Sequence, residues 1–196
     1  MPKFCSIIGA TLILSVSSAT PARQQEIAEL YRRGVSGDKA AVEQCIEKLE
    51  AVLKDQPNNQ LARVYLGSAY TLRSRDLGFG PKKLEALKRG LATMDEAVAA
   101  APDEPKVRLA RALTTSSLPA FFGRRSSSRK DFELLAETAQ RAPAKFEAGD
   151  LQIVYYNAGL AAKAAGDRAR AVALWREAQR HPENPSLVPK IEDALK

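Results

Sequence analysis

Histidine and cysteine are scarce in this chain of 196 residues, which contains one histidine and two cysteines. His181 stands beside Pro182 at the end of a predicted helix, where it suits a capping or solvated role. The sequence therefore disfavours a histidine-dependent catalytic triad and a histidine or cysteine metal site. Cys5 and Cys45 cannot form a framework of disulfides, so packing has to hold the domain together.

Other signatures of enzyme chemistry are also missing. Gly78 and Gly80 follow a predicted helix rather than a strand, and Pro81 comes directly after them, so they do not predict a phosphate-binding loop. Carboxylates are numerous, but they stand at helical spacing from lysines and arginines, as solvated helix faces do. We therefore predict a protein that is not an enzyme and that needs no cofactor and no metal.

The sequence also lacks the pattern of a β-sheet, because no segment alternates apolar and polar residues over a sufficient length. Apolar residues instead recur at helical spacing between prolines. Aromatic residues make up only 6% of the chain, and the abundant alanine suits close packing between helices. The sequence predicts an all-α fold.

The segment from Tyr155 to Pro185 has the clearest pattern, that of two antiparallel helices joined at Gly166-Asp167. Glycine tolerates the conformation that ends a helix, and aspartate is a good first cap for the next one. The first helix has small residues on one face, namely Ala158, Gly159 and Ala162. The second helix has an apolar stripe made of Ala171, Val172, Leu174, Trp175 and Ala178.

This segment resembles the tetratricopeptide repeat (TPR), a unit of about 34 residues that forms a helix-turn-helix. Its first helix matches the family's aromatic and small residues at Tyr155 and Ala158-Gly159, although Ala162 stands where a tyrosine is usual. The second helix matches the family pattern of alanine, aromatic residue, alanine and proline. The matching residues there are Ala171, Trp175, Ala178 and Pro182, of which the proline falls about one residue early.

Weaker copies of the unit precede it and also end at prolines. They run from Ile27 to Pro57, from Leu61 to Pro102 and from Pro105 to Pro143, and the segment 186–196 is predicted to cap the last unit. The resemblance implies an all-α, right-handed superhelical stack of about four TPR-like helix-turn-helix units with a C-terminal capping helix, in a domain spanning 23–196. An ordinary helical bundle is the alternative.

The N-terminus has the features of a secretory signal. Lys3 precedes an apolar run over residues 4–16, and small residues at Ser17 and Ala19 suit cleavage after Ala19. We expect residues 1–19 to be a signal peptide and the protein to be exported, either periplasmic or secreted. The alternatives are an uncleaved membrane anchor formed by residues 4–16 and, less in keeping with the pattern, a buried helix.

The second and third units each contain a long predicted insert, at residues 73–83 and 118–130. In each insert an aromatic residue and a glycine precede basic residues. One interpretation is a pair of loops that cover a phenylalanine and leave their charge in water. The other is a joint patch for an anionic partner, such as an acidic protein segment, lipid headgroups or an envelope polymer. That patch would consist of Lys82, Lys83, Arg124, Arg125, Arg129 and Lys130.

The family resemblance also implies a concave groove lined by the first helices of successive units. The corresponding residues form an apolar stripe, and they do not reproduce the lysine, asparagine and arginine set that some relatives use to hold a terminal carboxylate. The groove would therefore hold an amphipathic helix, an apolar peptide or a segment of this chain. Its candidate residues are Leu61, Val64, Leu109, Leu113, Tyr156 and Leu160, and Ser68 and Thr71 also occupy groove-lining positions.

Together these patterns predict a non-catalytic protein-binding or assembly scaffold in the cell envelope. A membrane-attached adaptor that contacts anionic surfaces through its basic inserts is the alternative. The net charge of +7 raises the question of nucleic acid, but no basic or aromatic residue recurs at one fixed position in each unit, so nucleic acid is a disfavoured partner. The sequence does not identify the partner or the oligomeric state.

Overall fold

The computed structural model describes residues 21–196, and within that range the chain is helical and contains no strand. The predicted signal peptide, residues 1–19, and the alternative anchor, residues 4–16, lie outside the described residues. The prediction of an all-α fold is confirmed. The helices are α1 (Pro21–Val35), α2 (Lys39–Asp55), α3 (Gln60–Asp76), α4 (Pro81–Ala100), α5 (Pro105–Ser116), α6 (Arg125–Arg141), α7 (Ala148–Ala164), α8 (Arg168–Gln179) and α9 (Val188–Leu195), with short 3-10 turns η1 (Ala120–Phe122) and η2 (Pro143–Lys145).

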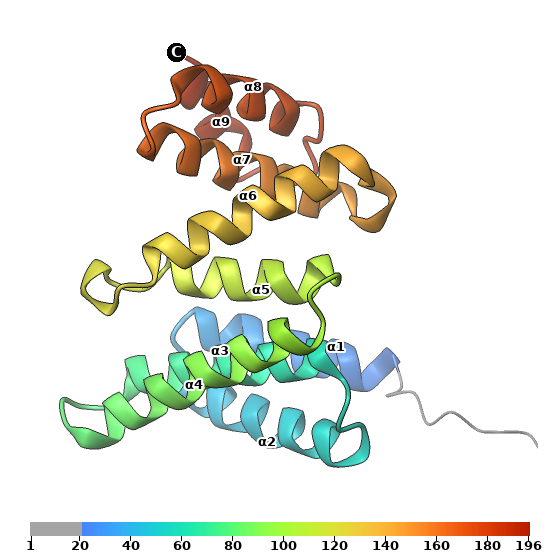
Figure 1. Cartoon of the computed structure of the whole chain (residues 1–196). Coiled ribbons are helices and arrows are strands. Elements are labelled where there is room, and N and C mark those ends of the chain that lie inside the picture. Colours follow the sequence, from blue (N-terminus) through green and yellow to red (C-terminus); the bar gives the residue numbers. More distant parts are fainter. Residues whose placement is uncertain (1–20) are drawn as a thin grey trace, which may run out of the picture.

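The helices pair in chain order into four hairpins that stack along one direction (Figure 1). The hairpins are α1–α2, α3–α4, α5–α6 and α7–α8. Each second helix also packs against the first helix of the next hairpin, and α9 packs against α8 at the C-terminal end. The predicted helix-turn-helix organisation with a C-terminal capping helix is therefore present in the described part of the chain.

Short polar and glycine signals place the helix boundaries. The side chain of Asp38 accepts a hydrogen bond from the backbone N–H of Ala41 at the start of α2, and Asp167 does the same for Arg170 at the start of α8. Gly166, with a φ of 87°, adopts the left-handed conformation that lets the chain reverse between α7 and α8. The turn predicted at Gly166-Asp167 is thus formed as expected.

Glycines also set how closely the helices of a hairpin approach. Gly67 of α3 and Gly90 of α4 face each other, and a Cβ atom added to Gly67 would lie 2.7 Å from the carbonyl oxygen of Gly90. In the last hairpin, a Cβ atom added to Gly159 would lie 2.3 Å from the indole of the fully buried Trp175. The indole nitrogen of Trp175 donates a hydrogen bond of 3.2 Å to the carbonyl of Tyr156. The small residues predicted at helix crossings therefore make direct backbone contact possible.

The two predicted inserts are shorter than expected. Helix α3 continues to Asp76 and α4 begins at Pro81, so only residues 77–80 link them. The second link runs over residues 117–124 and contains η1. The prediction failed because lysine and arginine favour helices and proline fits a first helical turn, so the basic residues after each link extend α4 and α6.

Candidate functional site

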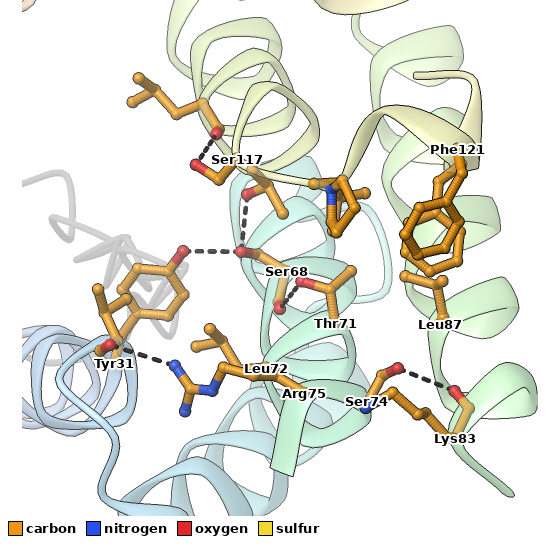
Figure 2. Close-up of a pocket in the computed structure, with 16 residues that line it drawn as sticks. Tyr31, Ser68, Thr71, Leu72, Ser74, Arg75, Lys83, Leu87, Ser117 and Phe121 are labelled. Carbon is orange, nitrogen blue, oxygen red and sulfur yellow. Dashed lines mark hydrogen bonds between the residues drawn. The ribbon is translucent and has the colours of Figure 1, made fainter. Parts of the chain in front are cut away.

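A cavity of about 700 Å³ lies at the edge of the stack where the first three hairpins turn (Figure 2). Its walls come from the C-terminal halves of α1, α3 and α5, the start of α4 and the link 117–124. Cavities of this size suit a small ligand or a segment of a protein. The apolar lining consists of Val35, Leu72, Leu87, Leu113, Leu118, Pro119, Phe121 and Phe122.

A chain of hydroxyl groups crosses the floor of this cavity and joins three first helices. Tyr31 Oη lies 2.7 Å from Ser68 Oγ, which lies 2.8 Å from Thr114 Oγ1. The hydroxyl of Thr114 donates to the carbonyl of Ala110 at 2.9 Å, so it accepts from Ser68, and Ser68 in turn accepts from Tyr31. Burial raises the pKa of Tyr31, so its phenol stays protonated at neutral pH and keeps this donating role.

Two cations line the cavity, and their charges are compensated differently. Arg75 pairs with Asp76 at 2.8 Å and donates to the carbonyls of Gly34 and Val35 at the end of α1. Lys83 Nζ donates to the carbonyl of Leu77 at 3.4 Å. Among residues 21–196, no carboxylate lies within ion-pair distance of Lys83. Lys83 therefore brings to the cavity a positive charge that no carboxylate of the described residues pairs with.

The link 117–124 forms one wall of the cavity and is anchored by a chain of ion pairs. Arg124 binds Asp95 of α4 at 2.9 Å, and Asp95 also binds Arg111 of α5 at 3.1 Å. Arg111 then binds the buried Asp131 of α6 at 2.7 Å, and Arg108 binds the same carboxylate at 3.0 Å. This network fixes the link relative to α4, α5 and α6. It thereby holds Phe121 and Phe122 beside the opening.

Replacing Arg124 with serine should loosen this wall. We expect the free energy of unfolding to fall by about 1 kcal/mol, because the lost ion pair is partly screened by solvent. The fluorescence of a tryptophan placed at Phe122 should report greater solvent exposure of the link in the R124S background. Arg125→Ser is the matched control, since Arg125 is exposed and has no ion-pair partner among the described residues. Equal effects of the two substitutions would show that the pair with Asp95 does not anchor the link.

The fold is similar to that of a solved structure, the crystal structure of a thermophilic TPR protein from Thermus thermophilus. The two structures match with a TM-score of 0.60 and 17% sequence identity, over 88% of this chain and 82% of the other. The chain has a TPR-like fold. No protein-family model and no curated protein sequence matches the TPR-like chain. The likeness is thus one of architecture, and the site has to be interpreted from its own residues.

The TPR-like stack separates the residues predicted to line the groove. Val64 and Leu109 are 0% and 5% exposed and belong to the core, so the prediction that they contact a guest was wrong. Each first helix packs against neighbours on two sides, and their side chains fill those contacts. Leu61, Leu160 and Leu113 are exposed, but only Leu113 among them lines the cavity.

Two other residues predicted to line the groove, Leu61 and Tyr156, lie outside the cavity of the TPR-like structure. Leu61 lines a smaller hollow between α1 and α3, and Tyr156 is half-buried on α7, outside the cavity. Ser68 and Thr71, in contrast, do line the cavity. Sequence reasoning missed Tyr31 and Phe121 as lining residues; the apolar run that contains Phe121, between two polar stretches, was the signal available for it.

The predicted basic patch is also divided among different roles. Arg124 is committed to Asp95, and Lys83 belongs to the cavity. The remaining four residues are exposed and have no carboxylate partner within residues 21–196; they are Lys82, Arg125, Arg129 and Lys130. The structure therefore joins one member of the predicted patch, Lys83, with three residues of the predicted groove, Ser68, Thr71 and Leu113, in a single cavity.

Membrane-spanning and metal-binding features are lacking in the part of the chain that the structure describes. No helix within residues 21–196 combines the length and apolar character needed to cross a membrane. The same residues contain no cluster of three or more side chains suited to hold a metal ion.

Proposed function

We propose that the chain is a non-catalytic interaction scaffold that receives an apolar segment of a partner protein in the cavity between α1, α3 and α5. The observation that carries this proposal is the apolar rim of the cavity. Phe121 is 80% exposed, and Val35 and Leu113 are also exposed to solvent. Large apolar side chains gathered on one surface are typical of sites that bind another protein.

Exposed apolar side chains outside the cavity also favour a segment of a protein over a small ligand. Phe79, in the link 77–80, is fully exposed, and Leu84 is exposed beside Lys83 at the start of α4. These links lie along the same edge of the stack (Figure 1). A ligand that filled only the cavity would leave these side chains in water, whereas a longer segment covers them.

Site-specific crosslinking tests this function. A photoreactive residue at position 121 should form a covalent adduct with a partner protein in the native cell fraction, and one at Gln179 on α8 should not. Introducing Leu113→Glu should abolish the adduct, because it places a charge in the apolar cavity. Leu160→Glu, an exposed leucine of α7 outside the cavity, is the matched control and should leave the adduct unchanged. Equal adducts from positions 121 and 179 would contradict the proposed site.

We also propose that the protein works outside the cytoplasm, in the periplasm or as a secreted protein. The pattern of Lys3, the apolar residues 4–16 and Ala19 supports this proposal. The mass of the mature protein in each cell fraction tests it. A chain that begins after Ala19 in the soluble envelope fraction is the expected result. An intact N-terminus in the membrane fraction would instead favour the membrane-attached adaptor.

A further inference from the structure

We propose that the segment entering the cavity carries a carboxylate beside its apolar side chains, and that this carboxylate pairs with Lys83. This inference rests on the proposed function and specifies the chemistry of the partner. It commits the site to an acidic, amphipathic segment of a protein.

The charges that line the cavity are the first observation. Within the described residues, Arg75 and Lys83 are its only charged lining residues, and both are cations. Arg75 is already neutralised by Asp76 and bound to two carbonyl groups. The ammonium group of Lys83 donates to one carbonyl of the described chain, at 3.4 Å. The unmatched positive charge therefore lies on Lys83, and a carboxylate is the complementary group.

The position of Lys83 on α4 is the second observation. Ser74 Oγ donates to the carbonyl of Lys83 at 2.8 Å and fixes the start of α4 against α3 (Figure 2). Leu87, one turn later on the same face of the helix, also lines the cavity. Glu85 lies two residues after Lys83, about 200° around a helix, and so points away from the cavity.

The environment of Lys83 strengthens a pair with a guest carboxylate. Its side chain is half-buried, and most of the other residues that line the cavity, such as Leu87 and Phe122, are apolar. When a guest covers the cavity and excludes water, the lower local dielectric strengthens the attraction between the two charges. The same change makes an unpaired Lys83 costly, so an uncharged guest would bind more weakly.

The exposed cations on the neighbouring turns support the same partner chemistry. Lys82 at the start of α4 and three residues in the first two turns of α6 have no carboxylate partner among the described residues; those three are Arg125, Arg129 and Lys130. Their exposed positive charges favour the approach of an acidic segment before it docks.

Binding of matched synthetic peptides tests the inference. The first probe is a fluorescein-labelled amphipathic peptide with leucine and phenylalanine on one helical face and glutamate flanking it. The second has glutamine at each glutamate position. By fluorescence anisotropy, the full chain should bind the glutamate peptide about tenfold more tightly than the glutamine peptide. Lys83→Met should remove most of this difference, whereas Lys82→Met, the matched control, should retain it.

The possible outcomes separate this inference from the proposed function. If both peptides bind equally and Leu113→Glu prevents both from binding, the role of the carboxylate is overturned and the proposed function stands. If Lys83→Met and Lys82→Met weaken the glutamate peptide equally, a general field acts and the specific pair with Lys83 is wrong. If neither peptide binds but dodecanoate does, the site takes a small amphiphile, which contradicts both proposals. Circular dichroism of each variant verifies that it is folded.

Discussion

Replacing Asp131 with alanine should lower the free energy of unfolding by about 3–5 kcal/mol. The Asp131 side chain is buried and accepts charged hydrogen bonds from Arg108 at 3.0 Å and from Arg111 at 2.7 and 2.9 Å. Its removal leaves two mostly buried guanidinium groups without their shared carboxylate. Among the described carboxylates, Arg111 then retains only Asp95. The loss is large because the cost is that of unpaired buried charge, not of one surface ion pair.

Denaturant unfolding followed by circular dichroism measures this effect. Glu133→Ala is the matched control, since Glu133 lies on the same helix, is half-buried and has no hydrogen bond or ion pair from its side chain among the described residues. The control should change stability by about 0.5 kcal/mol or less. A D131A protein within about 1 kcal/mol of the parent would show that the two arginines find other partners and that the network does not stabilise the third hairpin.

Replacing Gly67 with alanine should destabilise the protein by about 2–3 kcal/mol, although alanine is the better helix former. The new Cβ atom would lie 2.7 Å from the carbonyl oxygen of Gly90 and 2.9 Å from the backbone nitrogen of Met94. Backbone atoms of a helix cannot turn aside as a flexible side chain does. Helices α3 and α4 would have to move apart and lose contacts along their length.

Gly149→Ala is the matched control for this prediction. Gly149 lies in the first turn of α7, and within the described chain its added Cβ atom would meet only Glu183, at 3.8 Å. This substitution should stabilise the protein by about 0.4–1 kcal/mol, because it restricts the unfolded chain without a collision. Thermal and denaturant unfolding of both variants provide the comparison. If Gly67→Ala were as stable as Gly149→Ala, the close crossing of α3 and α4 would not limit packing.

The sequence predicted the features that depend on neighbouring residues. The turn at Gly166-Asp167 and the small face at Ala158 and Gly159 follow from local helix signals, and the structure contains both. The helical class and the hairpin organisation follow from the same periodicity. The lengths of the inserts do not follow from this periodicity. Gly78 and Gly80 indicate a break in the helix, whereas the helix-forming lysines after them already belong to α4.

The sequence did not predict the features that depend on distant residues. Arg124 and Asp95 stand 29 residues apart, and no local pattern indicates that they pair. Val64 was predicted to be accessible because an apolar residue on a first helix faces either the groove or a neighbouring hairpin. Only the packing of α3 against α4 and α5 decides between these two surroundings. The cavity was missed as a unit for the same reason, since its walls come from separate segments of the chain.

Of the described residues that line the cavity, none belongs to α7, α8 or α9. These three helices contribute instead to a core centred on Trp175, which they share with α5 and α6. The C-terminal quarter of the chain therefore packs behind the helices of the proposed binding cavity without lining it. If the proposed function holds, exchanging α7, α8 and α9 for another pair of hairpin helices and cap should leave the selectivity of binding unchanged.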